Sequence, residues 1–228
     1  MFISLKHKII YFHISRTAGT SITMMLENMF PEGKENKRKI FNRDILKHHS
    51  LKRIRNNWGN FANLEPYPFK HITQTDALPF LNIAGIDTSD YFCFTVVRNP
   101  YDRFLSQLKY LNLTSKGIDH YIETYGYLDT SLSGYWYKNQ VDYIKDPLSK
   151  NFAVYKFEKM YELYEKFSQL NHGCLPQIIN YNKNHPKLEP NNIEISLTLQ
   201  QKKKIYNMFQ LDFETFGYER GFPYSSGL

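Results

Sequence analysis

Cysteine is scarce in this chain, with only Cys93 and Cys174 among 228 residues. No metal-ligand spacing links the two, and nothing indicates a disulfide framework. Cys93 lies inside the apolar run "YFCFTVV", where a thiol usually serves as a small, inert core residue. The scarcity therefore argues against a disulfide-stapled scaffold and against a zinc module.

Long hydrophobic runs are also missing. The N-terminal stretch "MFISLKHKIIYFHI" carries lysines within its apolar part. It is too short and too interrupted for a signal peptide or a membrane anchor. The chain has no internal repeat and no low-complexity linker. We therefore expect a soluble, cytoplasmic protein, and a trimmed piece of a longer protein would look the same.

Acidic residues are the minority charge. The chain has 29 Lys and Arg against 22 Asp and Glu, a formal net charge of +7 and a pI near 9.2. This balance favours an anionic partner, such as a nucleotide, an acidic glycan, nucleic acid or a membrane surface. No nucleic-acid recognition motif accompanies the charge, so no nucleic acid is expected. The length favours one domain over residues 1–228, with 42% hydrophobic residues to fill its core.

Four apolar runs predict strands, namely residues 8–14, 69–73, 90–97 and 152–157. The first predicted helix begins at Ser21 and ends at the stop signals Pro31 and Gly33, and a second is expected near 42–55. A third begins at the caps Thr75 and Asp76 and continues through Leu81, and a fourth begins at Asn99 and Pro100. The last two cover 158–170 and 198–210. Strands alternating with helices predict an α/β fold with a mostly parallel central sheet covered on both faces.

Ligands of such sheets lie beyond the carboxyl ends of the strands. Four predicted strand ends carry polar residues, which are Ser15–Ser21, His71, Arg98 and Lys156–Glu158. Because these ends meet at one edge, we expect the four groups to share one site.

The stretch "YFHISRTAGTS" (11–21) predicts a strand, a small polar loop and a helix, an arrangement typical of phosphate sites. An ATP-binding loop has Gly-Lys before its last Ser or Thr, but Thr20 stands in place of that lysine. The cation is Arg16, earlier in the loop. No acidic strand end for Mg²⁺ is evident. A metal-free phosphate loop suits a transferring group less charged than phosphoryl, and a sulfuryl group fits.

These residues resemble a known family. "YFHISRTAGTSI" is similar to the 5′-phosphosulfate loop of carbohydrate sulfotransferases of the heparan and chondroitin type, which use PAPS, and "FTVVRNPYDRFLS" is similar to their 3′-phosphate motif. "FKHIT" resembles the segment that supplies the catalytic histidine. "QVDYI", "VYKFEKM", "LPQIIN" and "DFETFGYE" resemble weaker downstream landmarks. The resemblance covers nearly the whole chain, and the first two motifs together are specific.

The resemblance implies a three-layer sandwich of the P-loop-like sulfotransferase fold. It implies PAPS as donor, no metal, and a hydroxyl acceptor that is most often a glycan. Arg98 and Ser106 would bind the 3′-phosphate, Arg16 would stabilise the leaving phosphate, and His71 would be the general base. The remaining cofactor-binding residues would be Thr17, Ala18, Gly19, Thr20 and Ser21.

Two departures and several alternatives remain. The family's usual loop Lys is Arg16 here, and its usual Pro is Ser15. Arg98 could be a structural arginine, and His71 only a packed histidine. Because Arg16 replaces the usual Lys, the chain could also be a PAP- or PAPS-binding protein without turnover, and a third alternative is a nucleotide kinase with a degenerate loop. The basic segment 34–58 could line a glycan groove or be an ordinary solvated face. Oligomeric state and acceptor are not indicated.

Overall fold

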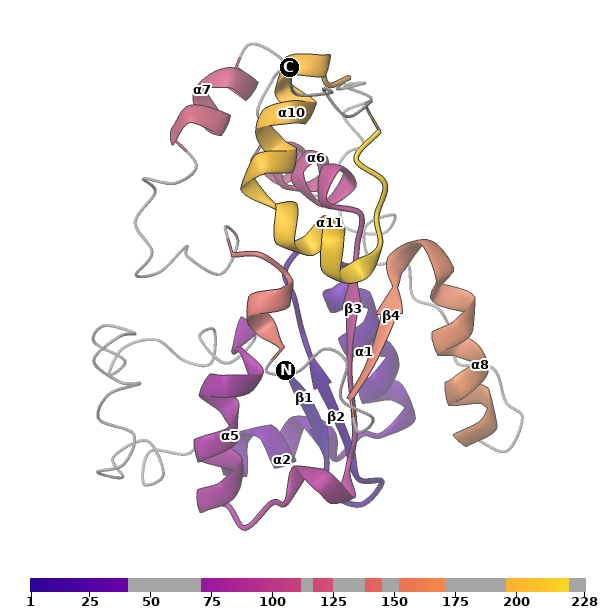
Figure 1. Cartoon of the computed structure of the whole chain (residues 1–228). Helices are drawn as coiled ribbons and strands as arrows, with labels where there is room; N and C mark the ends of the chain where they lie inside the picture. The colour runs from indigo at the N-terminus through magenta and orange to yellow at the C-terminus, as the bar shows by residue number, and fades with distance from the viewer. Residues whose placement is uncertain (41–70, 112–116, 125–137, 145–151, 171–195, 222–228) are drawn as a thin grey trace.

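The computed structural model describes residues 1–40, 71–111, 117–124, 138–144, 152–170 and 196–221. The chain is a mixed α/β protein built on a four-stranded sheet (Figure 1). The strands, in their order across the sheet, are β1 (Phe2–Ser4), β2 (Ile9–Phe12), β3 (Phe92–Val97) and β4 (Phe152–Lys156). The predicted helix over 42–55 lies outside the described residues.

The sheet is mostly parallel, as predicted. β2 pairs with β3 in parallel, and β3 pairs with β4 in parallel. β1 is antiparallel to β2 and was not predicted. It forms a hairpin with β2 across a turn in which Lys8 has a φ of 52°. Three residues are too few to show a period, so only their pairing with β2 defines them as a strand.

Helices pack against both faces of the sheet. In β2, Ile10 and Phe12 contact one apolar cluster while Ile9 and Tyr11 contact another. The first cluster includes side chains of α2 (Gly33–Ile40) and α5 (Gln74–Ile83). The second includes side chains of α1 (Gly19–Met29) and α8 (Met160–Leu170). All four residues of β2 are buried, which is why its sequence lacks the polar alternation of a half-exposed strand.

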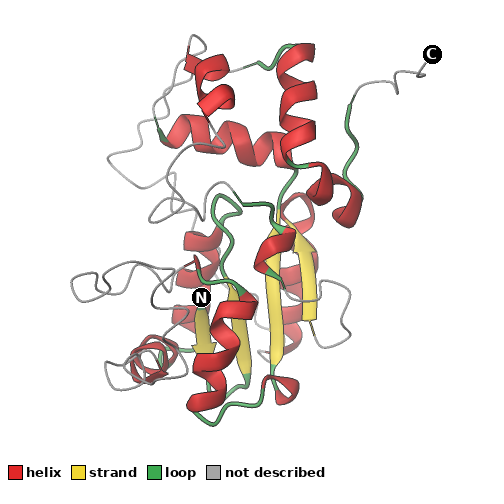
Figure 2. Ribbon diagram, turned by 60° about the vertical axis from the view of Figure 1, so that its left-hand side comes forward, coloured by secondary structure: helices red, strands yellow, loops and turns green. Residues whose placement is uncertain are grey.

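A third apolar cluster lies beyond the carboxyl ends of the parallel strands. It joins α6 (Pro100–Tyr110), α7 (Ile118–Thr124), α10 (Leu199–Met208) and α11 (Gln210–Phe216). These four helices gather at the top of Figures 1 and 2, with the sheet below them. Helices α10 and α11 replace the single helix predicted over 198–210, because the chain breaks at Phe209.

The predictions for Asn99, Pro100 and Cys93 are confirmed. The Asn99 side chain caps α6 by accepting a hydrogen bond from the Tyr101 amide at 2.9 Å, and Pro100 is the first helical residue. Cys93 is a buried core thiol, and burial raises its pKa to about 12. Among the described residues, no helix is long and apolar enough to cross a membrane.

The strand predicted over 69–73 is wrong where the structure describes it. Residues 71–73 lie outside the sheet, and the next helix, α5, is capped by Thr73, whose hydroxyl accepts from the Asp76 amide at 3.1 Å. The predicted caps Thr75 and Asp76 are therefore inside the helix. Two further boundaries shift, because α1 begins at Gly19 rather than Ser21 and a 3-10 turn, η8 (Phe157–Lys159), precedes α8.

Four short helical elements were not predicted. They are α2, which begins at the predicted stop signal Gly33, α7, the 3-10 helix η4 (Thr88–Asp90) and the 3-10 helix η7 (Val141–Tyr143). None is longer than eight residues, so each has too few apolar positions to show a helical period.

Candidate functional site

The loop between β2 and α1 has a constrained backbone. Arg16 and Ala18 have φ angles of 66° and 61°, in the left-handed region that L-residues rarely adopt. Each such residue costs on the order of 1–2 kcal/mol. The loop is held in this form by local bonds, because the Thr17 hydroxyl donates to the Ile14 carbonyl at 2.9 Å. A strained loop that its surroundings hold in place is typical of functional sites.

Glycine is required at the start of α1. A Cβ built on Gly19 would lie 1.8 Å from atoms of the His13 ring, so this ring packs directly on the helix backbone. His13 is buried, as expected for a structural residue at the end of a strand. In the described structure, α1 has no side-chain cap at Ala18 and no acidic residue in its first turn. The positive end of the α1 dipole is thus not offset by the helix's own side chains.

Arg16 reaches across the site to α6. Its Nε donates to the Ser106 hydroxyl at 3.2 Å, and its Nη2 donates to the Ser106 hydroxyl at 3.0 Å and to the Ser106 carbonyl at 2.9 Å. Its guanidinium carbon also lies 4.6 Å from the centre of the Tyr110 ring. Arg16 and Ser106 were assigned to the same site from sequence, and the structure brings them into direct contact.

Arg98 leaves β3 beside the same loop. Its Nη1 lies 3.5 Å from the Arg16 carbonyl, and its guanidinium covers the Phe157 ring at 4.4 Å. Its Nε is buried, and no residue of the described chain accepts its hydrogen. A buried guanidinium with an unused donor is costly, so the side chain is suited to an anion that would accept this hydrogen.

Burial disfavours the charged form of both arginines. Burial lowers the pKa of Arg16 to about 10, with the nearby Arg98 charge contributing in the same direction. Burial also lowers the pKa of Arg98, while Asp102 and Glu158 oppose the shift. Both shifts mean that the protein penalises two positive charges here. A bound anion would remove that penalty.

His71 lies against His13, at the start of the loop, although it does not end a strand. Its Nδ1 is 3.2 Å from the His13 carbonyl, and the two imidazole rings are 4.4 Å apart in an edge-on arrangement. Because a carbonyl can only accept, the contact selects the tautomer in which Nδ1 carries the proton. The lone pair then lies on Nε2, the arrangement that a general base needs.

Glu158, which follows β4, is engaged in structural contacts. Its Oε1 accepts from the Asn99 amide at 2.7 Å, and its Oε2 accepts from the Tyr218 hydroxyl at 3.0 Å. These contacts connect the exit of β4 to the start of α6 and to the C-terminal segment. The predicted convergence on one edge thus holds for Arg16, Arg98 and Glu158, which come from three strand exits.

Sequence reasoning missed a buried polar group next to these residues. It consists of Arg103, Gln140 and Asp212. The contact of the Tyr110 ring with Arg16 was also not predicted. Two signals were present. Arg103 lies beside the apolar stripe of α6, and Gln140 and Asp212 begin the stretches "QVDYI" and "DFETFGYE".

Comparison with known proteins agrees with this geometry. The sulfotransferase family model matches residues 1–191, most of the chain. The chain belongs to the sulfotransferase family. No curated protein and no solved structure matches it. All residues assigned to this sulfotransferase's site from sequence lie within the matched span, whereas α10 and α11 lie beyond it.

Proposed function

We propose that this sulfotransferase moves a sulfuryl group from PAPS to a hydroxyl group of a glycan and releases PAP. The family membership supports sulfuryl transfer in general. The packing of helices on both faces of the sheet supports the three-layer, P-loop-like arrangement of the nucleotide-binding sulfotransferases. The basic net charge of +7 agrees with an acidic donor and an acidic glycan acceptor.

The unused donor of Arg98 is the observation that carries the proposal. The 3′-phosphate is the group that distinguishes PAP and PAPS from simpler nucleotides, and a phosphate oxygen accepting from the Arg98 Nε would satisfy a buried hydrogen. Ser106 would donate its hydroxyl to the same phosphate. The cationic loop and the N-terminus of α1, from Thr17 to Ser21, would bind the 5′-phosphosulfate without a metal.

His71 would act on the acceptor. PAPS supplies the sulfuryl group. The Nε2 lone pair of His71 would take the proton of the acceptor hydroxyl as its oxygen forms a bond to sulfur and the bond from sulfur to the bridging oxygen breaks. Arg16 would stabilise the charge that builds on that leaving oxygen. The contact between His71 and the His13 carbonyl keeps the ring beside the loop that would hold the donor.

A second function is favoured by one observation. The Arg16 guanidinium is held by Ser106 and Tyr110, so it is already engaged on the α6 side of the loop. If the guanidinium cannot reach the bridging oxygen of the donor from this position, the chain would bind PAP or PAPS without turnover. Sulfate transfer to any acceptor would exclude this reading. PAP binding without transfer would support it.

Thermal unfolding in the presence of PAP or ADP tests the donor assignment. A ligand at a hundred times its Kd stabilises the folded state by about 2.7 kcal/mol. For a protein of this size the shift in Tm is roughly 5–10 °C. We expect this shift with PAP and a much smaller one with ADP, which lacks the 3′-phosphate. Equal shifts would exclude the assignment of Arg98.

The matched variants are Arg98→Ala and Lys109→Ala. Both remove one positive charge at α6 or its entry, but Lys109 is exposed and is assigned to neither phosphate of the donor. Arg98→Ala should abolish the difference between PAP and ADP, and Lys109→Ala should preserve it. If Arg98→Ala keeps the difference between the Tm shifts with PAP and ADP, another residue binds the 3′-phosphate.

A further inference from the structure

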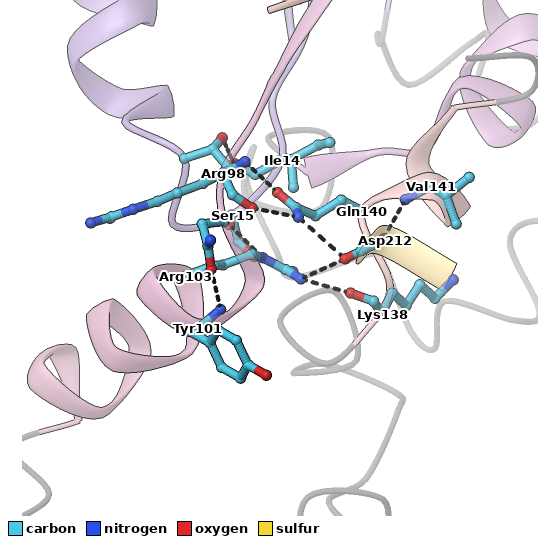
Figure 3. Close-up of polar contacts among 11 residues, drawn as sticks. Ile14, Ser15, Arg98, Tyr101, Arg103, Lys138, Gln140, Val141 and Asp212 are labelled. Atoms are coloured by element: carbon cyan, nitrogen blue, oxygen red, sulfur yellow. Dashed lines mark hydrogen bonds and ion pairs between the residues drawn. The ribbon is translucent and has the colours of Figure 1, made fainter. Parts of the chain in front are cut away.

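A buried carboxylate lies behind the proposed donor site. Asp212, on α11, is fully buried, and Figure 3 shows it among Gln140, Val141 and Arg103. Its Oδ2 accepts from the Gln140 Nε2 at 3.2 Å and lies 3.9 Å from the Arg103 Nη1, and its Oδ1 accepts from the Val141 amide at 3.0 Å. Both oxygens of a single carboxylate are therefore in use.

Gln140 joins this carboxylate to Arg98. Its Oε1 accepts from the Arg98 amide at 2.8 Å, and its Nε2 donates to the Arg98 carbonyl at 2.8 Å. A side-chain amide thus makes the two bonds that a neighbouring strand would make, at the first residue after β3. These bonds fix the peptide planes on both sides of Arg98, and with them the direction in which its side chain leaves the chain.

Asp212 reinforces the orientation of the Gln140 amide that the Arg98 amide and carbonyl select. A carboxylate only accepts hydrogen bonds, so it requires the NH₂ end of Gln140 on its own side. The oxygen of Gln140 is then left for the Arg98 amide. A neutral or donor group in place of Asp212 would remove this reinforcement and weaken the hold of Gln140 on Arg98.

Arg103 connects the same carboxylate to the phosphate loop. Its Nε donates to the Ser15 carbonyl at 3.2 Å, and its Nη1 donates to the Lys138 carbonyl at 3.0 Å (Figure 3). Asp212 is thus linked through Gln140 to Arg98, and through Arg103 to the residue before Arg16. The two segments that would hold the two phosphate groups of the donor share one anchor.

Stability alone does not account for this arrangement. Burial raises the pKa of Asp212, so the protein holds its charge at a cost. Well-packed apolar residues in place of a buried ion pair are often neutral or stabilising. In some proteins a buried polar group is retained despite this cost because it imposes one geometry on its neighbours. Asp212 also lies beyond residues 1–191, which the family model matches.

We propose that Gln140 and Asp212 are positioning residues that set Arg98 for the 3′-phosphate of the donor. The inference rests on the proposed function, since it presupposes that Arg98 binds that phosphate. Under this proposal, α11 supports the donor site through Asp212, although no side chain of this helix need contact the nucleotide. Neither residue takes part in the chemistry.

The test measures the Kd of PAP and of ADP by calorimetry, well below the Tm of each variant. Gln140→Glu keeps the shape of the side chain but replaces the Nε2 donor with an acceptor that faces both Asp212 and the Arg98 carbonyl. We expect PAP to bind at least roughly tenfold more weakly, the usual effect of leaving a buried polar pair unmatched. The Kd of ADP should stay within about twofold, because ADP has no 3′-phosphate for Arg98 to read.

A merely structural role would give a different result. Partial unfolding raises the apparent Kd of both ligands by the same factor, so it leaves their ratio unchanged. Ile205→Val, in the buried face of α10, is the matched control, which should lower the Tm and keep the ratio. Asp212→Asn is the milder second variant should Gln140→Glu not fold, and it should also reduce the preference for PAP.

The outcomes separate the two proposals. A wild-type protein that does not prefer PAP over ADP would overturn the donor assignment and this inference together. A wild-type protein that prefers PAP, with both variants keeping that preference, would overturn only the role of Gln140 and Asp212. A preference lost in either variant and kept in Ile205→Val is the predicted result.

Discussion

Arg16→Lys is the substitution that the loop geometry predicts most sharply. The positive charge is conserved, and the backbone cost of the φ of 66° is the same for both side chains. The forked contact with Ser106 and the stacking on Tyr110 are not conserved, because an ammonium has neither the fork nor the planar face. We therefore expect the lysine variant to lose activity, although lysine is the usual residue of the family's loop.

The magnitude follows from the lost contacts. One hydrogen bond is worth about 0.5–1.5 kcal/mol net, and a cation–π contact at a partly exposed site adds about 0.5–1 kcal/mol. The contacts that orient the Arg16 side chain thus contribute roughly 1–2.5 kcal/mol. If this is lost from the transition state, kcat falls roughly 5- to 70-fold.

The assay is sulfate transfer at saturating PAPS, with the Kd of PAP measured in parallel. Tyr110→Leu removes only the stacking and should cause a smaller loss, roughly 2- to 5-fold. Lys109→Ala, an exposed change on the same helix, should have no effect. A lysine variant as active as the wild type, or more active, would refute the reasoning that the loop is shaped around arginine.

The other predictions concern the fold, the base, the metal and the thiol. Gly19→Ala should lower the free energy of unfolding by about 1–3 kcal/mol in urea, because the new methyl overlaps the His13 ring; an unchanged midpoint would contradict the packing. His71→Ala should leave the Kd of PAP unchanged and cut kcat by roughly 10²–10⁴, and full turnover would place the base elsewhere. Transfer should survive EDTA, whereas loss of activity that Mg²⁺ restores would favour the kinase alternative. In a Cys174→Ser variant, Cys93 should resist thiol reagents at pH 8 until the protein unfolds, since burial raises its pKa to about 12; rapid labelling of the folded protein would contradict this.

Much of the fold was predictable because its signals are local. The buried run of β3, followed by Asn99 as cap and Pro100 as first helical residue, specifies a strand, a turn and a helix within twenty residues. The strand predicted at 69–73 shows the limit of this reasoning. Its apolar residue Ile72 is buried because it packs against the first apolar cluster, and a short apolar segment looks the same whether it joins a sheet or only covers one.

In the candidate site, too, local signals were predictable and long-range contacts were not. Arg16, Arg98 and Ser106 were predicted to share one site from two motifs, and the structure brings Arg16 into contact with Ser106 and with Arg98. The anchor behind them was not found, because Gln140 and Asp212 are 72 residues apart and their contact depends on tertiary packing. The stretches "QVDYI" and "DFETFGYE" mark the two residues separately, but nothing in either stretch indicates that they meet.

Transfer of radiolabelled sulfate from PAPS tests the central claim most directly. The protein is incubated with labelled PAPS, EDTA and a panel of glycans, lipids and phenols. The labelled product and the released PAP are then both quantified. The account predicts labelled glycan and an equal amount of PAP, with the rate strongly reduced in Arg98→Ala and unchanged in Lys109→Ala. No labelled product with any acceptor, or transfer that is as fast in Arg98→Ala as in the wild type, would contradict it.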